Sequence, residues 1–180
     1  MIAWLIIEKI KAGHATTLGA ASGAVAGLVA ITPACAFVAP WAAAVIGILA
    51  AILIIESVYF FERRGIDDPV GAISVHGVGG LFGTLSVGIF ANGTYGAGWN
   101  GSSSEGVKGI IKGDWGQLGA QAVGAVTIVI VCGTISYAFF ALQNKFTKGG
   151  IRSKAEDEVV GLDMAEMGVL AYPEFSGSHK

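Results

Sequence analysis

Long apolar stretches separated by polar or proline-containing segments predict a membrane protein made of helices. The stretch 16–61 contains a single charged residue, Glu56. It is too long for one crossing, since a helix spans the hydrocarbon core with about 20 residues. Pro33 and Pro40 divide it, because proline interrupts the helical hydrogen-bond ladder. We therefore predict two separate helices, over 16–32 and 41–62.

Two more apolar stretches follow the same pattern. The polar loop "RRGIDDP" precedes a helix predicted over 70–91, and a loop rich in Gly, Asn and Ser precedes one predicted over 117–142. The opening "MIAWLII" is apolar from its first residue but meets charge at Glu8, so the segment 1–10 is too short to cross. We interpret it as part of a spanning helix, and we expect the chain to be a fragment of a longer protein.

The placement of basic residues predicts the orientation of these helices. Cytoplasmic segments next to membrane helices are enriched in Lys and Arg. The polar tail 143–180 carries Lys145, Lys148, Arg152 and Lys154, so we expect it in the cytoplasm. Residues 1–142 then form one polytopic, all-α membrane domain in the cell membrane, and 143–180 form a tail of its own.

Composition agrees with a membrane protein and narrows its function. The chain is 53% hydrophobic and 13% charged, about half the charged share of a soluble domain. A net charge of -2 gives no indication of nucleic-acid binding. No Ser-His-Asp, phosphate-loop or metal-ligand pattern occurs, and Cys35 and Cys132 are not in a redox or metal spacing. The sequence therefore predicts neither an enzyme nor a protein with a metal or another cofactor.

Glycines spaced four residues apart predict close packing between the helices. Small residues at this spacing allow membrane helices to approach one another closely. The pattern occurs in the helix 16–32 and again in the helix 70–91. The glycines concerned are Gly19, Gly23, Gly27, Gly79 and Gly83. We expect them to lie at helix–helix contacts of a bundle.

The helix 70–91 has a recognisable beginning and an unusual interior residue. Asp68 is placed to cap it, and Pro69 suits its first turn. His76 lies eight residues beyond Asp68, about 12 Å into the membrane, and Ser22 lies about 9 Å from the same side. The two side chains could share one depth on neighbouring helices.

Two interpretations of His76 follow from the residues alone. An ionisable residue inside a membrane indicates a functional site, and a neutral imidazole offers one donor and one acceptor nitrogen to a small polar solute. Alternatively, a neutral histidine bonded to a backbone carbonyl could simply hold two helices together.

Three motifs in order resemble the ammonium transporter family. They are "LGAASGAVAGLVAITPACAFVAPWAAAVIG" at 18–47, "DDPVGAISVHGVGGLFGTLSVGIFA" at 67–91, and "GLDMAEMGVLAYPEF" at 161–175. The resemblance covers nearly the whole chain. It implies the end of the seventh helix, the eighth to eleventh helices and the tail of an eleven-helix fold that assembles as a homotrimer.

The resemblance also implies roles for individual residues. His76 matches the second of two pore histidines, along which ammonia passes after ammonium is deprotonated, and Ser22 matches a serine near the cytoplasmic exit. The first pore histidine falls in the fifth helix of the family, outside the present sequence. Gly161 and Asp163 match a contact between the tail and the neighbouring subunit.

The family comparison predicts ammonium, ammonia and methylammonium as solutes, and a P-II-type signal protein as a partner at the cytoplasmic face if the source is prokaryotic. We expect the isolated chain to be inactive because the pore needs both parts of the fold. Two alternatives remain open at this point: a non-conducting ammonium sensor, and a structural remnant that only forms trimers.

Overall fold

The computed structural model describes residues 1–98 and 104–173. It divides into two units, Met1–Val129 and Ile130–Lys180, which are described separately below. In the described residues the secondary structure is helical, with two isolated β-bridges, Val38 with Ala91 and Asn92 with Lys108, and no strand.

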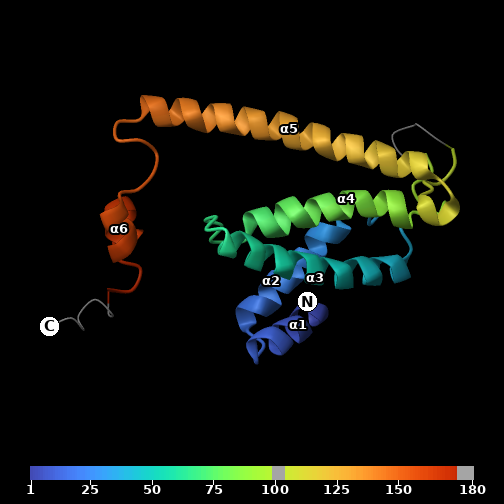
Figure 1. Cartoon of the computed structure of the whole chain (residues 1–180), viewed down its shortest axis with the longest axis horizontal. Helices are drawn as coiled ribbons and strands as arrows, with labels where there is room; N and C mark the ends of the chain where they lie inside the picture. The colour runs from blue at the N-terminus through green and yellow to red at the C-terminus, as the bar shows by residue number, and fades with distance from the viewer. Residues whose placement is uncertain (99–103, 174–180) are drawn as a thin grey trace. The chain divides into compact units, whose positions relative to one another are not determined.

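The first unit is built around four helical segments and their connections (Figure 1). These are α1 (Ile2–Ala12), α2 (Thr17–Ile31), α3 (Pro40–Arg63) and a helix formed by the π-helical segment η1 (Ile73–Val78) and α4 (Gly79–Phe90). A short 3-10 turn, η3 (Ile110–Lys112), precedes α5 (Trp115–Phe146). α2 and α3 contact each other and both contact α1, η1 and α4, so these two helices lie at the centre of this unit.

Three helices are long and apolar enough to cross a membrane. They are Pro40–Arg63, Ile73–Phe90 and Trp115–Phe146. The fourth predicted span is shorter than expected, because α2 contains 15 residues, about 22 Å of helix. It ends at Ile31, two residues before Pro33, and a run of turns continues the chain to α3. α3 begins at Pro40 itself, where the missing N–H costs no helical hydrogen bond.

Small residues form much of the core between the helices. Ala26 and Ala30 of α2 are buried in one cluster with Ile46 and Ile54 of α3, which are fully buried. Alanines allow the backbones to approach, and the isoleucines fill the remaining space. In α5, by contrast, Ala125 is the one buried residue among those described. An apolar helix with so little burial has a surface suited to lipid or to further protein.

The second unit contains the polar tail. After the last residues of α5 it forms a short helix, α6 (Ala155–Val160), and a π-helical turn, η4 (Asp163–Met167). Arg152 pairs with Glu158, and the Ser153 hydroxyl donates a hydrogen bond to Glu166. None of the tail residues that the structure describes is buried, so these local contacts hold that segment together. Residues 174 and 175 of the third motif lie outside the described residues.

Candidate functional site

The helix that carries His76 begins later than the sequence suggested. Oδ2 of Asp68 accepts hydrogen bonds from the backbone N–H groups of Ile73, at 3.0 Å, and Ser74, at 3.4 Å. Gly71 has a φ of +66°, a left-handed conformation that interrupts the helix, and its N–H donates to the carbonyl of Asp68. Pro69 therefore lies in the turn before the helix and not in its first helical turn.

His76 lies within the π-helical segment η1. A π turn closes its hydrogen bonds over five residues instead of four, and such turns occur frequently at functional sites. The wider turn places the imidazole on the opposite side from Ser74, which is fully buried, whereas His76 is exposed within this chain. η1 contacts both α2 and α3. The buried side of the segment thus anchors it while His76 faces outward.

The His76 imidazole lines a cavity of about 280 Å³. Its other walls come from the turn after α2, from η1 and α4, and from the first half of α5, all within the first unit. They are formed by Pro33, Gly77, Gly80, Leu81, Thr84, Ala125, Ile128 and Val129. Thr84 donates its hydroxyl to the carbonyl of Gly80. The imidazole is therefore the ionisable group of an otherwise largely apolar cavity.

The imidazole of His76 makes no hydrogen bond to any residue that the structure describes. The alternative of a histidine that joins two helices through a backbone carbonyl needs such an acceptor. In the described part of the chain that acceptor is absent. Both ring nitrogens are thus available to a solute in the cavity.

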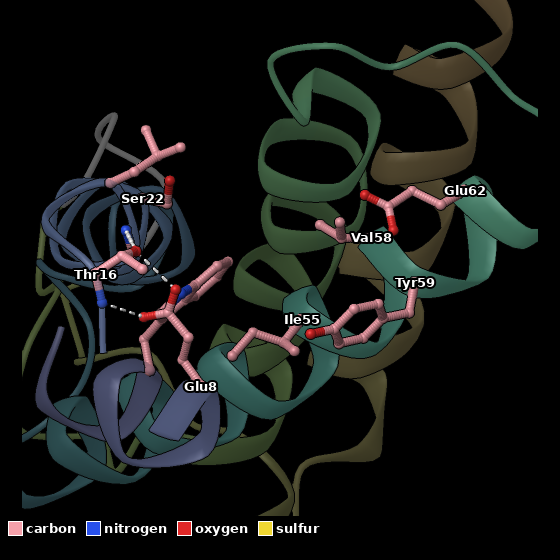
Figure 2. A pocket seen from close by; sticks show the side chains of 10 residues that line it. Glu8, Thr16, Ser22, Ile55, Val58, Tyr59 and Glu62 are labelled. Atoms are coloured by element: carbon pink, nitrogen blue, oxygen red, sulfur yellow. Dashed lines mark hydrogen bonds between the residues drawn. The ribbon is translucent and has the colours of Figure 1, made fainter. Parts of the chain in front are cut away.

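Ser22 lines a different cavity, of about 310 Å³, between α1, α2 and α3. Figure 2 shows Thr16 and Ser22 on one side and the α3 residues Ile55, Val58, Tyr59 and Glu62 opposite them, with Glu8 below. His76 is not among the residues that line it. The structure therefore does not bring Ser22 and His76 to one cavity, although their helices are neighbours.

A carboxylate that the sequence analysis did not single out organises this second cavity. Glu8 accepts hydrogen bonds from the backbone N–H of Thr16, at 3.1 Å, and from its hydroxyl, at 2.7 Å. The Thr16 hydroxyl oxygen in turn accepts from the N–H of Gly19, at 2.8 Å, and so caps α2. Threonine is a residue type favoured at helix N-caps, but nothing in the sequence indicates that Glu8 bonds to Thr16.

An ion pair lies beside this cavity. Lys11 pairs with Glu56, and the Lys11 ammonium also lies over the ring of Tyr59, 5.0 Å from its centroid. Glu56, the single charged residue of the stretch 16–61, is therefore neutralised by α1. This explains how an acidic residue is accommodated within a long apolar helix.

Four of the five spaced glycines lie where a side chain would collide with a neighbour. A Cβ on Gly19 would meet the carboxylate of Glu8, and one on Gly23 would lie 2.5 Å from Cβ of Trp4. On Gly79 it would lie 2.9 Å from Cδ1 of Ile54, and on Gly83 it would meet the backbone of Ala30. Gly27 differs from the others, because no atom of the described residues lies within 4 Å of the same point. Its spacing matches the motif, but no described residue packs against α2 at this position.

The tail residues Gly161 and Asp163 form a local structure. Gly161 has a φ of +116°, which ends α6, and Oδ2 of Asp163 accepts from the N–H of Ala171 at 2.9 Å. Asp163 thus closes the loop that follows η4. In the described residues no cluster of three or more His, Cys, Asp or Glu side chains could hold a metal ion.

Comparison with known proteins assigns the chain to a family. The Ammonium Transporter Family profile matches residues 1–172. "Ammonium transporter Amt2" of Archaeoglobus fulgidus is 42% identical over 154 residues, which are 86% of this chain and 32% of that protein. "Ammonium transporter" of Mycobacterium tuberculosis is 41% identical over 177 residues, 96% of this chain and 35% of that protein.

Solved structures show the same fold. The crystal structure of Mep2 from Saccharomyces cerevisiae matches with a TM-score of 0.76 and 32% identity, over 86% of this chain and 34% of that one. Mep2 from Candida albicans matches with a TM-score of 0.73 and 28% identity, over 98% of this chain and 39% of that one. The present sequence spans about a third of the length of these relatives. With a family match along nearly its entire length, the chain is a member of the ammonium transporter family.

Proposed function

We propose that this chain forms part of an ammonium-transporting membrane protein in which His76 lines the path of ammonia. The observation that carries the proposal is the His76 cavity: an imidazole without a protein partner among the described residues, surrounded by largely apolar walls. Membership of the ammonium transporter family supplies the solute.

The chemistry of the cavity suits ammonia better than ammonium. A cation in an apolar cavity loses its hydration without a counter-charge, which is costly. Neutral ammonia carries donors and a lone pair, so it can exchange hydrogen bonds with a neutral imidazole, which carries one donor and one acceptor nitrogen. The family mechanism, in which ammonium is deprotonated before ammonia passes, is compatible with these walls.

Ser22 has a separate place in the proposal. We assign its hydroxyl to the cytoplasmic end of the path, where a solute leaving the apolar region would meet polar groups again. Glu8 and Glu62 line the same cavity and make it acidic. Such a cavity favours reprotonation of ammonia, because nearby carboxylates stabilise the resulting ammonium.

The remaining features of the proposal concern assembly. The exposed apolar surface of α5 and the open side of the His76 cavity are surfaces that additional helices of the family fold would cover. We propose a homotrimer in the cell membrane, with a cytoplasmic tail whose Gly161 and Asp163 contact the neighbouring subunit. A P-II-type protein at the cytoplasmic face and methylammonium as a second solute are parts of the same proposal.

The test is methylammonium uptake by transporter-deficient cells. We expect no uptake with these 180 residues alone, and uptake when the remaining two thirds of a related transporter are supplied with them. His76→Ala should then lower uptake about tenfold, the effect of losing roughly 1.4 kcal/mol of hydrogen bonding to the solute. His14→Ala is the matched control, since His14 is exposed in the turn between α1 and α2.

Equal uptake by His76→Ala and the unaltered protein would refute the role of His76. Uptake by the 180 residues alone would refute the dependence on further helices. A protein that reaches the membrane with its partner segment but never conducts would support the sensor or the structural alternative instead.

A further inference from the structure

Ser74 is the one residue in the described part of the chain with a buried side-chain polar atom that lacks a hydrogen-bond partner. The residue is fully buried, on the side of η1 away from the His76 cavity. Leaving a buried hydroxyl unsatisfied is costly, because it has lost its bonds to water without replacement. Native proteins satisfy most such groups, and ordered water is a frequent partner.

Other helical hydroxyls of this chain satisfy themselves within their own helix. Thr84, Ser86 and Thr127 each donate to the carbonyl four residues earlier, at 2.8–2.9 Å. For Ser74 that carbonyl would belong to Val70, which lies in the turn before Gly71. The left-handed conformation of Gly71 separates Val70 from the helix, so the usual acceptor is missing. The unpartnered hydroxyl is thus a consequence of how the helix begins.

A small cavity of about 30 Å³ lies beside Ser74. Its walls come from the end of α3, the loop that follows it and the start of η1, and Glu62, Asp68 and Ser74 are its polar residues. A cavity needs about 10–15 Å³ of this kind of volume to hold one water molecule. The space is therefore large enough for a water and too small for an organic ligand.

The polar groups around this space match the bonding capacity of water. Asp68 accepts the two backbone N–H groups of η1 through Oδ2. Its Oδ1 makes no hydrogen bond to the residues that the structure describes. A water molecule can accept from the Ser74 hydroxyl and donate to two carboxylates, which gives it the three bonds typical of a buried water.

We propose that this cavity is a binding site for one ordered water molecule, held by Ser74, Asp68 and Glu62. The water connects the end of α3 to the beginning of η1, two residues before His76. It completes the cap that Asp68 provides and fixes the start of the helix that carries the imidazole. The site is separate from the His76 cavity and shares only one polar residue, Glu62, with the Ser22 cavity, so a water peak at Ser74 can be tested without measuring transport.

A structure of the full-length protein near 2 Å resolution, with Ser74→Ala and Ser86→Ala variants, tests the site. We expect a water peak within hydrogen-bonding distance of the Ser74 hydroxyl, with its height lowered or lost in Ser74→Ala and unchanged in Ser86→Ala. Ser86 is the matched control because it is equally buried but donates to its own helix. A cavity without a peak in the unaltered protein would overturn the proposal.

Thermal unfolding gives a second measurement. The direction in which the unfolding midpoint changes distinguishes a cavity that holds water from a dry one. If water is bound, Ser74→Ala removes one of its partners, and the unfolding midpoint of the full-length protein should fall by about 1 °C. If the cavity is dry, the same substitution removes an unsatisfied hydroxyl, and the midpoint should stay or rise. A peak that shows anomalous scattering after sodium is exchanged for rubidium would identify a cation and would also overturn the proposal.

Discussion

Gly83 allows the contact between α2 and α4 to be tested with a single methyl group. A Cβ at Gly83 would lie 3.0 Å from the carbonyl carbon of Ala30, still closer to its oxygen, and 3.1 Å from Cδ of Pro33. Ordinary contacts begin at 3.4 Å. The neighbouring atoms belong to the backbone and to a proline ring, so none of them can rotate aside. Gly83→Ala must therefore push the two helices apart.

The free-energy cost of this collision can be separated from the general preference of helices for alanine over glycine. Replacing a helical glycine by alanine gains about 0.8–1 kcal/mol from helix propensity alone. Gly27→Ala should show this gain without a penalty, because no atom lies within 4 Å of its added methyl group. Overpacking in a rigid contact costs about 1–3 kcal/mol. The difference between the two variants isolates the contact, since the propensity gain cancels.

The assay is thermal unfolding of the 180-residue chain in detergent, followed by tryptophan fluorescence. We expect the midpoint of Gly83→Ala to lie about 2–12 °C below that of Gly27→Ala, at roughly 2–4 °C for each kcal/mol. Equal midpoints would refute the reasoning, because they would show that α2 and α4 separate without cost or do not meet at Gly83.

Three further predictions concern caps and charges. Thr16→Ala should lower the free energy of unfolding by about 1 kcal/mol in denaturant titrations, since it removes the α2 cap, while Thr17→Ala on the exposed neighbour should have a smaller effect. Asp68→Asn should lower it by a similar amount, because the charge at the helix beginning is lost; an unchanged value would show that the cap contributes nothing. The hydrogen bond and charge of Lys108 hold the pKa of Glu105 below its ordinary value. The pair therefore stabilises the folded state at pH values above the ordinary pKa. This stabilisation is lost as the pH falls through the lowered pKa. In carboxyl NMR titrations Lys108→Gln should raise the pKa of Glu105 towards the ordinary value, and no change would contradict the pairing.

The sequence predicted the helices better than their ends. Proline and glycine positions divide the apolar stretches, and each predicted helix has a counterpart within three residues of its predicted beginning. The late start of the helix carrying His76 was missed because glycine does not reveal the sign of its φ angle. Gly71 adopts the left-handed conformation, whereas Gly77 continues the helix.

The spaced glycines also show that a sequence motif does not by itself establish a contact between helices. Gly27 and Gly83 occupy similar positions in their motifs, yet Gly83 touches backbone and Gly27 touches nothing described. Which face of a helix finds a neighbour depends on the rotation of the whole helix, and α2 has too uniform a distribution of small and apolar residues to fix that rotation. The bond between Glu8 and Thr16 was missed for a related reason, since it depends on how α1 folds back onto α2.

The π-helical segment Ile73–Val78 can lose a residue with less disturbance than a regular α-helix can. A π turn stores one more residue than an α turn, so removing a residue there could restore α geometry without moving either end of the helix. Side chains on either side of the segment would then keep their present directions, whereas losing a residue from a regular α-helix rotates every side chain beyond it by about 100°. A deletion here would therefore change the direction in which the imidazole points and leave the rest of the helix in place.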